Sequence, residues 1–143
     1  MSLTAIKTAI QNKLDDCSHI GVVYGYETGQ ETGHPYATVT KSRMESRFGD
    51  NKRNINDWFF SVKLYQERSK EGFGVSKAER VSDEMVDEVV TAFHMDTTLS
   101  GTCKYIEPVD CDFSYVEMDK AVRVADITLK AQEVFDTGTG AVT

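Results

Sequence analysis

The sequence predicts an α+β fold, a two-layer sandwich in which two amphipathic helices cover one face of a mostly antiparallel sheet of four to five strands. Two stretches, 3–17 and 76–95, repeat their apolar residues at helical spacing. The stretches between and after them alternate apolar with polar residues, which is typical of strands with one buried face. The predicted order of elements is α-β-β-β-α-β-β, and short turns between successive strands favour antiparallel pairing.

The first three elements are predicted from periodicity and from turn residues. Apolar residues recur at helical spacing from Leu3 to Cys17, so an N-terminal helix is expected there. A short strand follows over Gly21–Tyr26 (GVVYGY), which is rich in β-branched and aromatic residues. The glycine-spaced segment 27–35 predicts a loop, and a second strand is expected over Tyr36–Ser42.

The middle of the chain combines an irregular stretch with the clearest strand and the second helix. Residues 44–54 show no regular periodicity, so we expect either a long connection or a hairpin arm. A third strand over Asp57–Gln66 alternates four apolar residues with a mixed set. The second helix is predicted to begin at a capping box of Ser76 and Glu79 and to end near Met95.

The last two strands are expected over Cys103–Val116 and Ala121–Phe135, joined by a turn at 117–120. Within the last strand the apolar residues change from one set of alternate positions to the other near Ala125. This change predicts either a β-bulge at that point or burial of both faces of the strand.

Composition bounds the class of protein. The chain has 143 residues, 40% of them hydrophobic, 27% charged and only two prolines, which favours one globular domain over a disordered chain. We expect residues 1–136 to form a single α+β domain and residues 137–143 to form a flexible C-terminal tail. No apolar run approaches the roughly 18 residues of a membrane helix, and no signal-peptide core is present. The three cysteines lack metal-ligand spacing and suit a reducing compartment, so we expect a soluble protein made in the cytoplasm.

The sequence predicts no catalytic, cofactor or metal site. None of the three histidines stands in the spacing expected of zinc ligands. No Gly-x-Ser-x-Gly nucleophile elbow occurs, and Gly25, Gly29 and Gly33 lack the lysine and helix start that a phosphate loop needs. Asp110 and Asp112 share one strand face, where acids are usually solvated. We therefore do not expect an enzyme.

Charge is distributed unevenly along the chain. The net charge is −7, from 16 basic and 23 acidic residues, which disfavours wrapping of duplex DNA. Residues 41–53 nevertheless carry five basic residues against two acidic ones, a net +3. A basic arm on an acidic body favours self-association; the alternatives are a solvated loop and a nucleic-acid contact. The candidate subunit-interface or channel residues on this arm are Arg43, Arg47, Phe48, Lys52 and Arg53.

The predicted second helix carries an acidic face as well. Its members are Asp83, Glu84, Asp87 and Glu88. Such a face is most often solvated surface. The alternative is that it faces a passage for DNA, where like charge keeps the nucleic acid from sticking.

Several runs of the chain resemble one known family. They are VVYGYE, YATVT, FFSVKLYQ, AERVSDEMVDEVVTAF, HMDTTLSGTCKYIEPVD and ITLKAQEVFD. Over about Leu3–Phe135 they are similar to the tail terminator (tail completion) proteins of long non-contractile-tailed bacteriophages. The most telling part is the predicted second helix with the segments 96–101 and 106–109 that follow it.

The resemblance implies a structural virion protein without enzymatic activity or cofactor. Members of the family form a hexameric ring on the last ring of the tail tube, stop tube polymerisation and join the tail to the head. The implied partners are further copies of the chain, the tail tube protein and the head-completion or connector protein, with DNA only passing through the ring and no membrane. The implied location is the tail or neck of the virion, after assembly in the host bacterial cytoplasm.

Other functions stay open beside this one. Within the same class, the alternatives are a head-closure, neck or tail-tube component. From other classes, they are a small ligand-binding α+β module, which predicts an apolar pocket, and an unrecognised hydrolase, which predicts titrating residues in a cleft.

Overall fold

The computed structural model describes residues 3–26, 35–50, 53–67, 74–99, 101–117 and 121–136. Its elements are α1 (Leu3–Asp15), β1 (Val22–Tyr24), β2 (Tyr36–Asp50), β3 (Arg53–Glu67), α2 (Gly74–Met95), β4 (Tyr105–Glu117) and β5 (Ala121–Asp136). The strands form one five-stranded sheet in the order β1-β2-β3-β5-β4. β1 runs parallel to β2, and the other neighbouring strands pair antiparallel. The predicted α+β class and the order of elements are confirmed.

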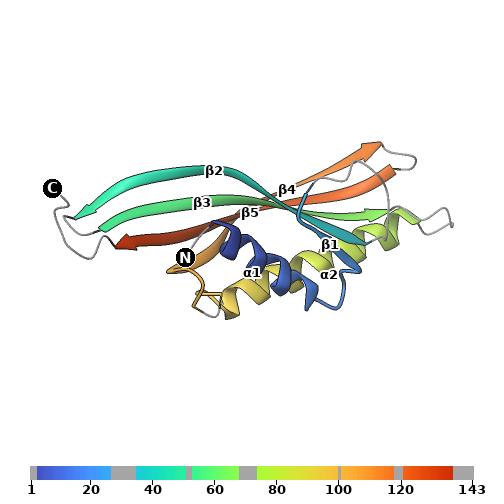
Figure 1. Ribbon diagram of the computed structural model, residues 1–143. Helices are drawn as coiled ribbons and strands as arrows, with labels where there is room; N and C mark the ends of the chain where they lie inside the picture. The colour runs from blue at the N-terminus through green and yellow to red at the C-terminus, as the bar shows by residue number, and fades with distance from the viewer. Residues whose placement is uncertain are drawn as a thin grey trace.

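Both helices lie on the same side of the sheet, which we call the helix-side face (Figure 1). Ile6, Ile10 and Leu14 of α1 recur one turn apart and are fully buried. Burying a side chain of this size contributes about 1.5–3 kcal/mol relative to leaving it in water. The fully buried core residues on α2 and on the facing strands are Met85, Val89, Phe93, Ala37, Val39, Phe60, Val62, Leu64, Ala125, Ile127, Leu129 and Ala131.

The opposite, helix-free face of the sheet holds a second, smaller core. Its buried members are Tyr36, Tyr65, Val122 and Val124. The change of pattern near Ala125 is therefore explained by burial of both faces of β5, as one of the two alternatives predicted. The other alternative, a β-bulge near Ala125, is wrong, because β5 pairs with β3 without a register shift. The shift lies in β4 instead, between Pro108 and Asp110.

β2 and β3 continue past the helices as a hairpin, which we call the arm (residues 41–53, of which the structure describes 41–50 and 53). Figure 1 shows the arm extending beyond the helix layer, together with the C-terminal end of β5. Of the two predictions for this stretch, the hairpin arm is confirmed, and both the long connection and the end of the strand at Ser42 are wrong. A register shift between Lys41 and Arg43 changes which face alternate residues occupy, and residues 41–48 are exposed. Because neither face of this stretch is buried, its sequence does not show the regular alternation of apolar and polar residues that predicts a strand.

The other boundaries agree with the sequence to within a few residues. α2 begins at Gly74, ahead of Ser76, so the predicted capping box does not stand at the start of the helix. The side chains of 74–79 lie outside the described residues. So do the predicted tail at 137–143 and residues 118–120 of the predicted turn.

Candidate functional site

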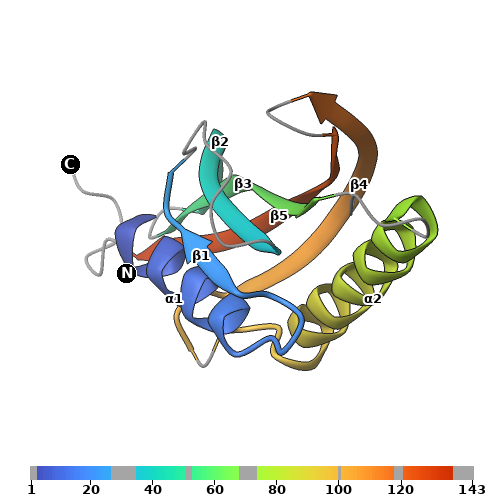
Figure 2. The ribbon, with the colours of Figure 1, turned by 90° about the vertical axis from the view of Figure 1, so that its right-hand side faces the viewer.

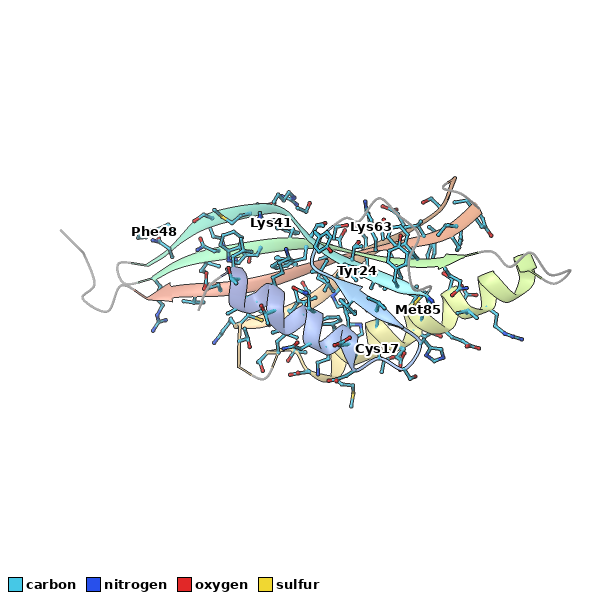
Figure 3. All side chains as sticks on the ribbon, turned by 45° about the vertical axis from the view of Figure 1, so that its right-hand side comes forward. Cys17, Tyr24, Lys41, Phe48, Lys63 and Met85 are labelled. Atoms are coloured by element: carbon cyan, nitrogen blue, oxygen red, sulfur yellow. The ribbon has the colours of Figure 1, made fainter. Side chains whose placement is uncertain are left out.

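The arm presents the predicted interface residues to solvent. Arg43, Arg47, Phe48 and Arg53 are exposed, and Lys52 lies outside the described residues. Phe48 is the clearest case, because 73% of its surface is accessible. In Figure 3, Phe48 stands near the end of the arm, far from Cys17 and Met85 in the helix layer. The structure thus gathers four of the five residues on one projecting hairpin.

Arg43 stands on the helix-free face, over an aromatic ring of the neighbouring strand. Its guanidinium carbon lies 3.9 Å from the ring centroid of Phe59, which is 7% exposed. The guanidinium also pairs with the carboxylate of Glu45. A cation–π contact of this kind contributes about 0.5–1 kcal/mol at an exposed site. More than half of the Arg43 side chain, 57%, stays open to a partner.

Arg47 has a structural contact as well as an exposed surface. Its Nη1 donates to Oδ2 of Asp57 at 3.0 Å, and the Asp57 side chain is only 3% exposed. Gln132 Nε2 donates to the other oxygen of this carboxylate at 3.3 Å. Because a buried carboxylate needs such partners, Arg47 helps to hold β3 against β2. Its own side chain remains 54% exposed.

The helix-side face of the arm is apolar and partly hollow. Met44 lies opposite Trp58 in the β2–β3 register and is exposed. Trp58 Nε1 donates to Oε1 of Glu133 at 3.2 Å, which satisfies the indole. A hollow of about 260 Å³ opens at the base of the arm, lined by Lys41, Ser42, Arg43, Met44 and Trp58.

The acidic face of α2 divides into two parts. Glu88 accepts hydrogen bonds from the backbone N–H groups of Ser18 and His19, both at 2.9 Å, and from the Ser18 hydroxyl at 2.9 Å. His19 Nδ1 lies 2.8 Å from Glu88 Oε1, and its Nε2 lies 3.4 Å from a carboxylate oxygen of Glu84. Glu84 and Glu88 therefore fasten the α1–β1 turn to α2. Asp83 and Asp87 are exposed to solvent.

The two partners in this contact shift each other's pKa. Burial raises the pKa of Glu88, but the hydrogen bonds from His19 and Ser18 outweigh burial and hold this pKa at about 2. The hydrogen bond to Glu88 raises the pKa of His19 above its usual value. Because the charged form of each group favours that of the other, the pair is a polar clasp between the α1–β1 turn and α2.

The structure also shows a surface that the sequence did not single out, along β4. This strand stands last in the sheet, and its exposed apolar residues are Val109, Phe113 and Tyr115. The Arg123 guanidinium lies 5.3 Å from the Phe113 ring centroid and 4.7 Å from the Tyr115 ring centroid. The alternation of aromatic and acidic residues was visible in the sequence. The edge position was not, because it depends on the order of the strands.

Little in the described residues points to catalysis or metal binding. They contain no group of three or more His, Cys, Asp or Glu side chains placed to hold a metal ion. Cys17, Cys103 and Cys111 are free, and burial raises the pKa of each thiol to about 11. A hollow of about 270 Å³ beside α1 contains the ion pair of Lys13 with Asp96, at 2.9 Å. Within the described part, no helix is long and apolar enough to cross a membrane.

Comparison with solved structures finds a similar fold in a virion. One chain of the virion of a native gene transfer agent particle superposes with a TM-score of 0.56 and 14% sequence identity. The match covers 92% of this chain and 96% of that chain, so the two share the fold over nearly their whole lengths. The sequence matches no protein-family model and no curated protein.

Proposed function

We propose that this chain is a non-enzymatic structural protein of a phage-like virion and that it acts there as a tail terminator. In this role it forms a ring of six copies on the head-proximal end of the tail tube, stops tube polymerisation and joins the tail to the head connector. The observation that carries the proposal is the arm, an exposed basic hairpin on an acidic chain. The fold shared with a virion chain and the resemblance of the sequence runs support it.

The arm supplies the contacts of this ring. Its candidate residues Arg43, Arg47, Phe48, Lys52 and Arg53 pack on an adjacent copy or line the channel. An exposed aromatic residue among arginines has the composition found at the centre of protein interfaces. The single α+β domain of residues 1–136 forms the body of each subunit.

The acidic residues suit a passage that DNA crosses without being held. Asp83, Glu84 and Asp87 are the exposed members of the α2 acidic face and are open to such a lumen. Glu84 and Glu88 add their charge while fastening the α1–β1 turn. With a net charge of −7, the ring repels DNA at long range. The other partners are the tail tube protein and the head-completion or connector protein, inside a virion assembled in the bacterial cytoplasm.

The direct test is to image the purified protein with and without purified tail tubes. Mass photometry gives the number of copies, and negative-stain imaging shows where they sit. Six-fold rings, or caps at one end of the tubes, support the tail terminator. Copies that lengthen the tubes indicate a tail-tube component, and binding to the head connector alone indicates a head-closure component. A monomer that ignores tubes at every concentration contradicts the proposal and favours a ligand-binding module.

The arm itself is tested by reversing its charge. We expect the triple variant Arg47→Glu, Lys52→Glu, Arg53→Glu to stay folded and to lose ring formation, because its arm then repels an acidic neighbour. The control is Arg80→Glu with Lys104→Glu, which changes charge in the same sense at exposed residues outside the arm. Rings formed by the triple variant as well as by wild type remove the arm from the interface.

A further inference from the structure

We propose that the contact between copies joins the β2 edge of one arm to the β4 edge of the next copy, with the helix layers of both on the same side. This inference rests on the proposed ring and names the two surfaces that close it. The occupant of each edge is a second copy of this chain.

Both edges of the sheet are open in the described structure. β1 pairs with β2 only over Tyr36–Thr38, so the rest of β2, as far as Phe48, has no described strand on that side. β4 pairs with β5 and stands last in the order of strands. The two edges lie on opposite sides of the same sheet, so one copy can use both at once. A contact between different surfaces of identical chains is heterologous, and it closes a ring when the rotation allows.

The helix-free faces of the two edges carry opposite charge. Residues directly opposite each other in an antiparallel pair lie on the same face. Arg43, Glu45 and Arg47 lie on this face, opposite Phe59, Asp57 and Ile55, so this side of β2 carries two positive charges and one negative charge. On β4, Asp110 lies opposite Thr128, and Asp112 follows it on the same face. The β4 strand carries four acidic residues and no basic one, whereas the arm is basic.

The helix-side faces of the two edges both carry exposed apolar side chains, although on the arm Ser46 lies between Met44 and Phe48. On the arm, Met44 and Phe48 lie on this face, and both are exposed. On β4, Phe113 lies opposite the core residue Ala125, and Tyr115 continues the same face. Both of these aromatic residues are more than 40% exposed. Each edge is thus an amphipathic strip with charge on one face and apolar side chains on the other.

Matching the strips fixes how neighbouring copies are oriented. When the helix layers stand on the same side, arginines meet aspartates and apolar side chains meet one another. If one copy is turned over, charges meet aromatic rings, which leaves buried charges unpaired. Only the first arrangement keeps every helix layer on one side of a continuous wall, as a ring requires.

Side chains, rather than the bare backbone edges, select the partner. β2 has a register shift between Lys41 and Arg43, and β4 has one between Pro108 and Asp110. Bulges and a proline on an edge strand hinder indiscriminate strand addition. The two strips therefore recognise each other mainly by charge and by apolar contact.

Two charge-reversed variants test this contact. The arm variant is Arg43→Glu with Arg47→Glu, and the edge variant is Asp110→Lys with Asp112→Lys. In each variant the arm and the edge carry the same sign, so we expect association to be weakened more than about tenfold. In an equal mixture, every arm meets an edge of opposite sign, so rings with alternating copies form again. A ring of six allows this alternation.

The readout is sedimentation velocity over a concentration series, alone and with tail tubes. The control is Asp15→Lys with Asp16→Lys, which makes the same change of charge as the edge variant at exposed residues by the C-terminal end of α1 and leaves ring formation intact. Thermal unfolding checks that both variants fold. If the loss of the Arg47 contact with Asp57 unfolds the arm variant, Arg43→Glu alone takes its place.

The outcomes separate this inference from the proposed function. Variants that fail alone and assemble together support the edge contact. Variants that still form rings alone, or a mixture that stays monomeric while wild type assembles, overturn the edge contact and leave the ring standing. A wild-type protein that forms no ring, with or without tubes, contradicts the proposed function itself.

Discussion

Strand β3 runs through two regions of the molecule that are built differently. Under the helices it contributes Phe60, Val62 and Leu64 to the core, and each is fully buried. At its arm end the same strand keeps its pairing with β2 and β5, but Arg53 and the adjoining Asn54 are exposed. Backbone hydrogen bonds thus continue where side-chain burial stops. Figure 2, turned by 90° from Figure 1, shows both helices on one side of the curved sheet, α1 near β1 and α2 near β4. The covered region stabilises the fold, whereas the arm leaves its side chains exposed to solvent.

The largest expected effect comes from truncating one phenylalanine in each region. Phe60→Ala leaves a cavity in the core and should lower the free energy of unfolding by about 3–5 kcal/mol. Phe48→Ala removes a side chain that is 73% exposed and should change that free energy by less than about 0.5 kcal/mol. Urea denaturation measures both. Equal losses at the two positions would show that the arm is packed against something within the monomer.

A smaller difference is expected between two arginines of the arm. Arg47→Ala leaves the buried Asp57 carboxylate with fewer partners and should cost about 1–3 kcal/mol of folding free energy. Arg53→Ala, at the exposed end of β3, should cost less than about 0.5 kcal/mol. Thermal or urea unfolding compares them, and Arg47→Lys should recover part of the loss. If Arg47→Ala is as harmless as Arg53→Ala, the contact with Asp57 does not hold the arm.

The smallest effect concerns the polar clasp of the covered region and its dependence on pH. The pKa of Glu88 lies at about 2, below its ordinary value of 4.5, so its contribution to stability is present above pH 4.5 and lost as pH falls through about 2. The pKa of His19 is raised above 6.5, so its contribution is present below pH 6.5 and lost as pH rises through the raised value. Glu88→Gln should therefore cost about 1 kcal/mol between pH 4.5 and 6.5.

Unfolding measured across pH checks this last expectation. Glu88→Gln should flatten both the loss at acidic pH and the loss above pH 6.5, whereas Glu84→Gln should alter mainly the latter, because the Glu84 carboxylate pairs with the histidine ring. Identical pH profiles for wild type and Glu88→Gln would mean that the clasp contributes nothing to folding.

The sequence predicted well wherever burial imposes a period on the residues. The apolar repeat of Ile6, Ile10 and Leu14 and the alternation over 57–66 each report a buried face, and both elements were predicted correctly. The arm lacks this signal, because its residues 41–48 are exposed and a register shift interrupts the alternation.

Tertiary contacts limited what the sequence indicated about the candidate site. The sequence indicated that the arm residues are exposed, because most of them are charged. The contacts of Glu88 with Ser18 and His19 join residues 69 and 70 positions apart, and no local pattern encodes them. The edge position of β4 was equally hidden, since it depends on β5 pairing between β3 and β4.

The three free thiols are poorly reactive, which matters when the protein passes from reducing to oxidising conditions. A thiol attacks disulfides only as the thiolate, and a pKa of about 11 leaves roughly one thiol in ten thousand ionised at neutral pH. Cys17 and Cys103 are also buried, which keeps oxidants from their sulfur atoms. Transfer of the protein from reducing to oxidising conditions is therefore expected to leave these thiols largely free of disulfide cross-links.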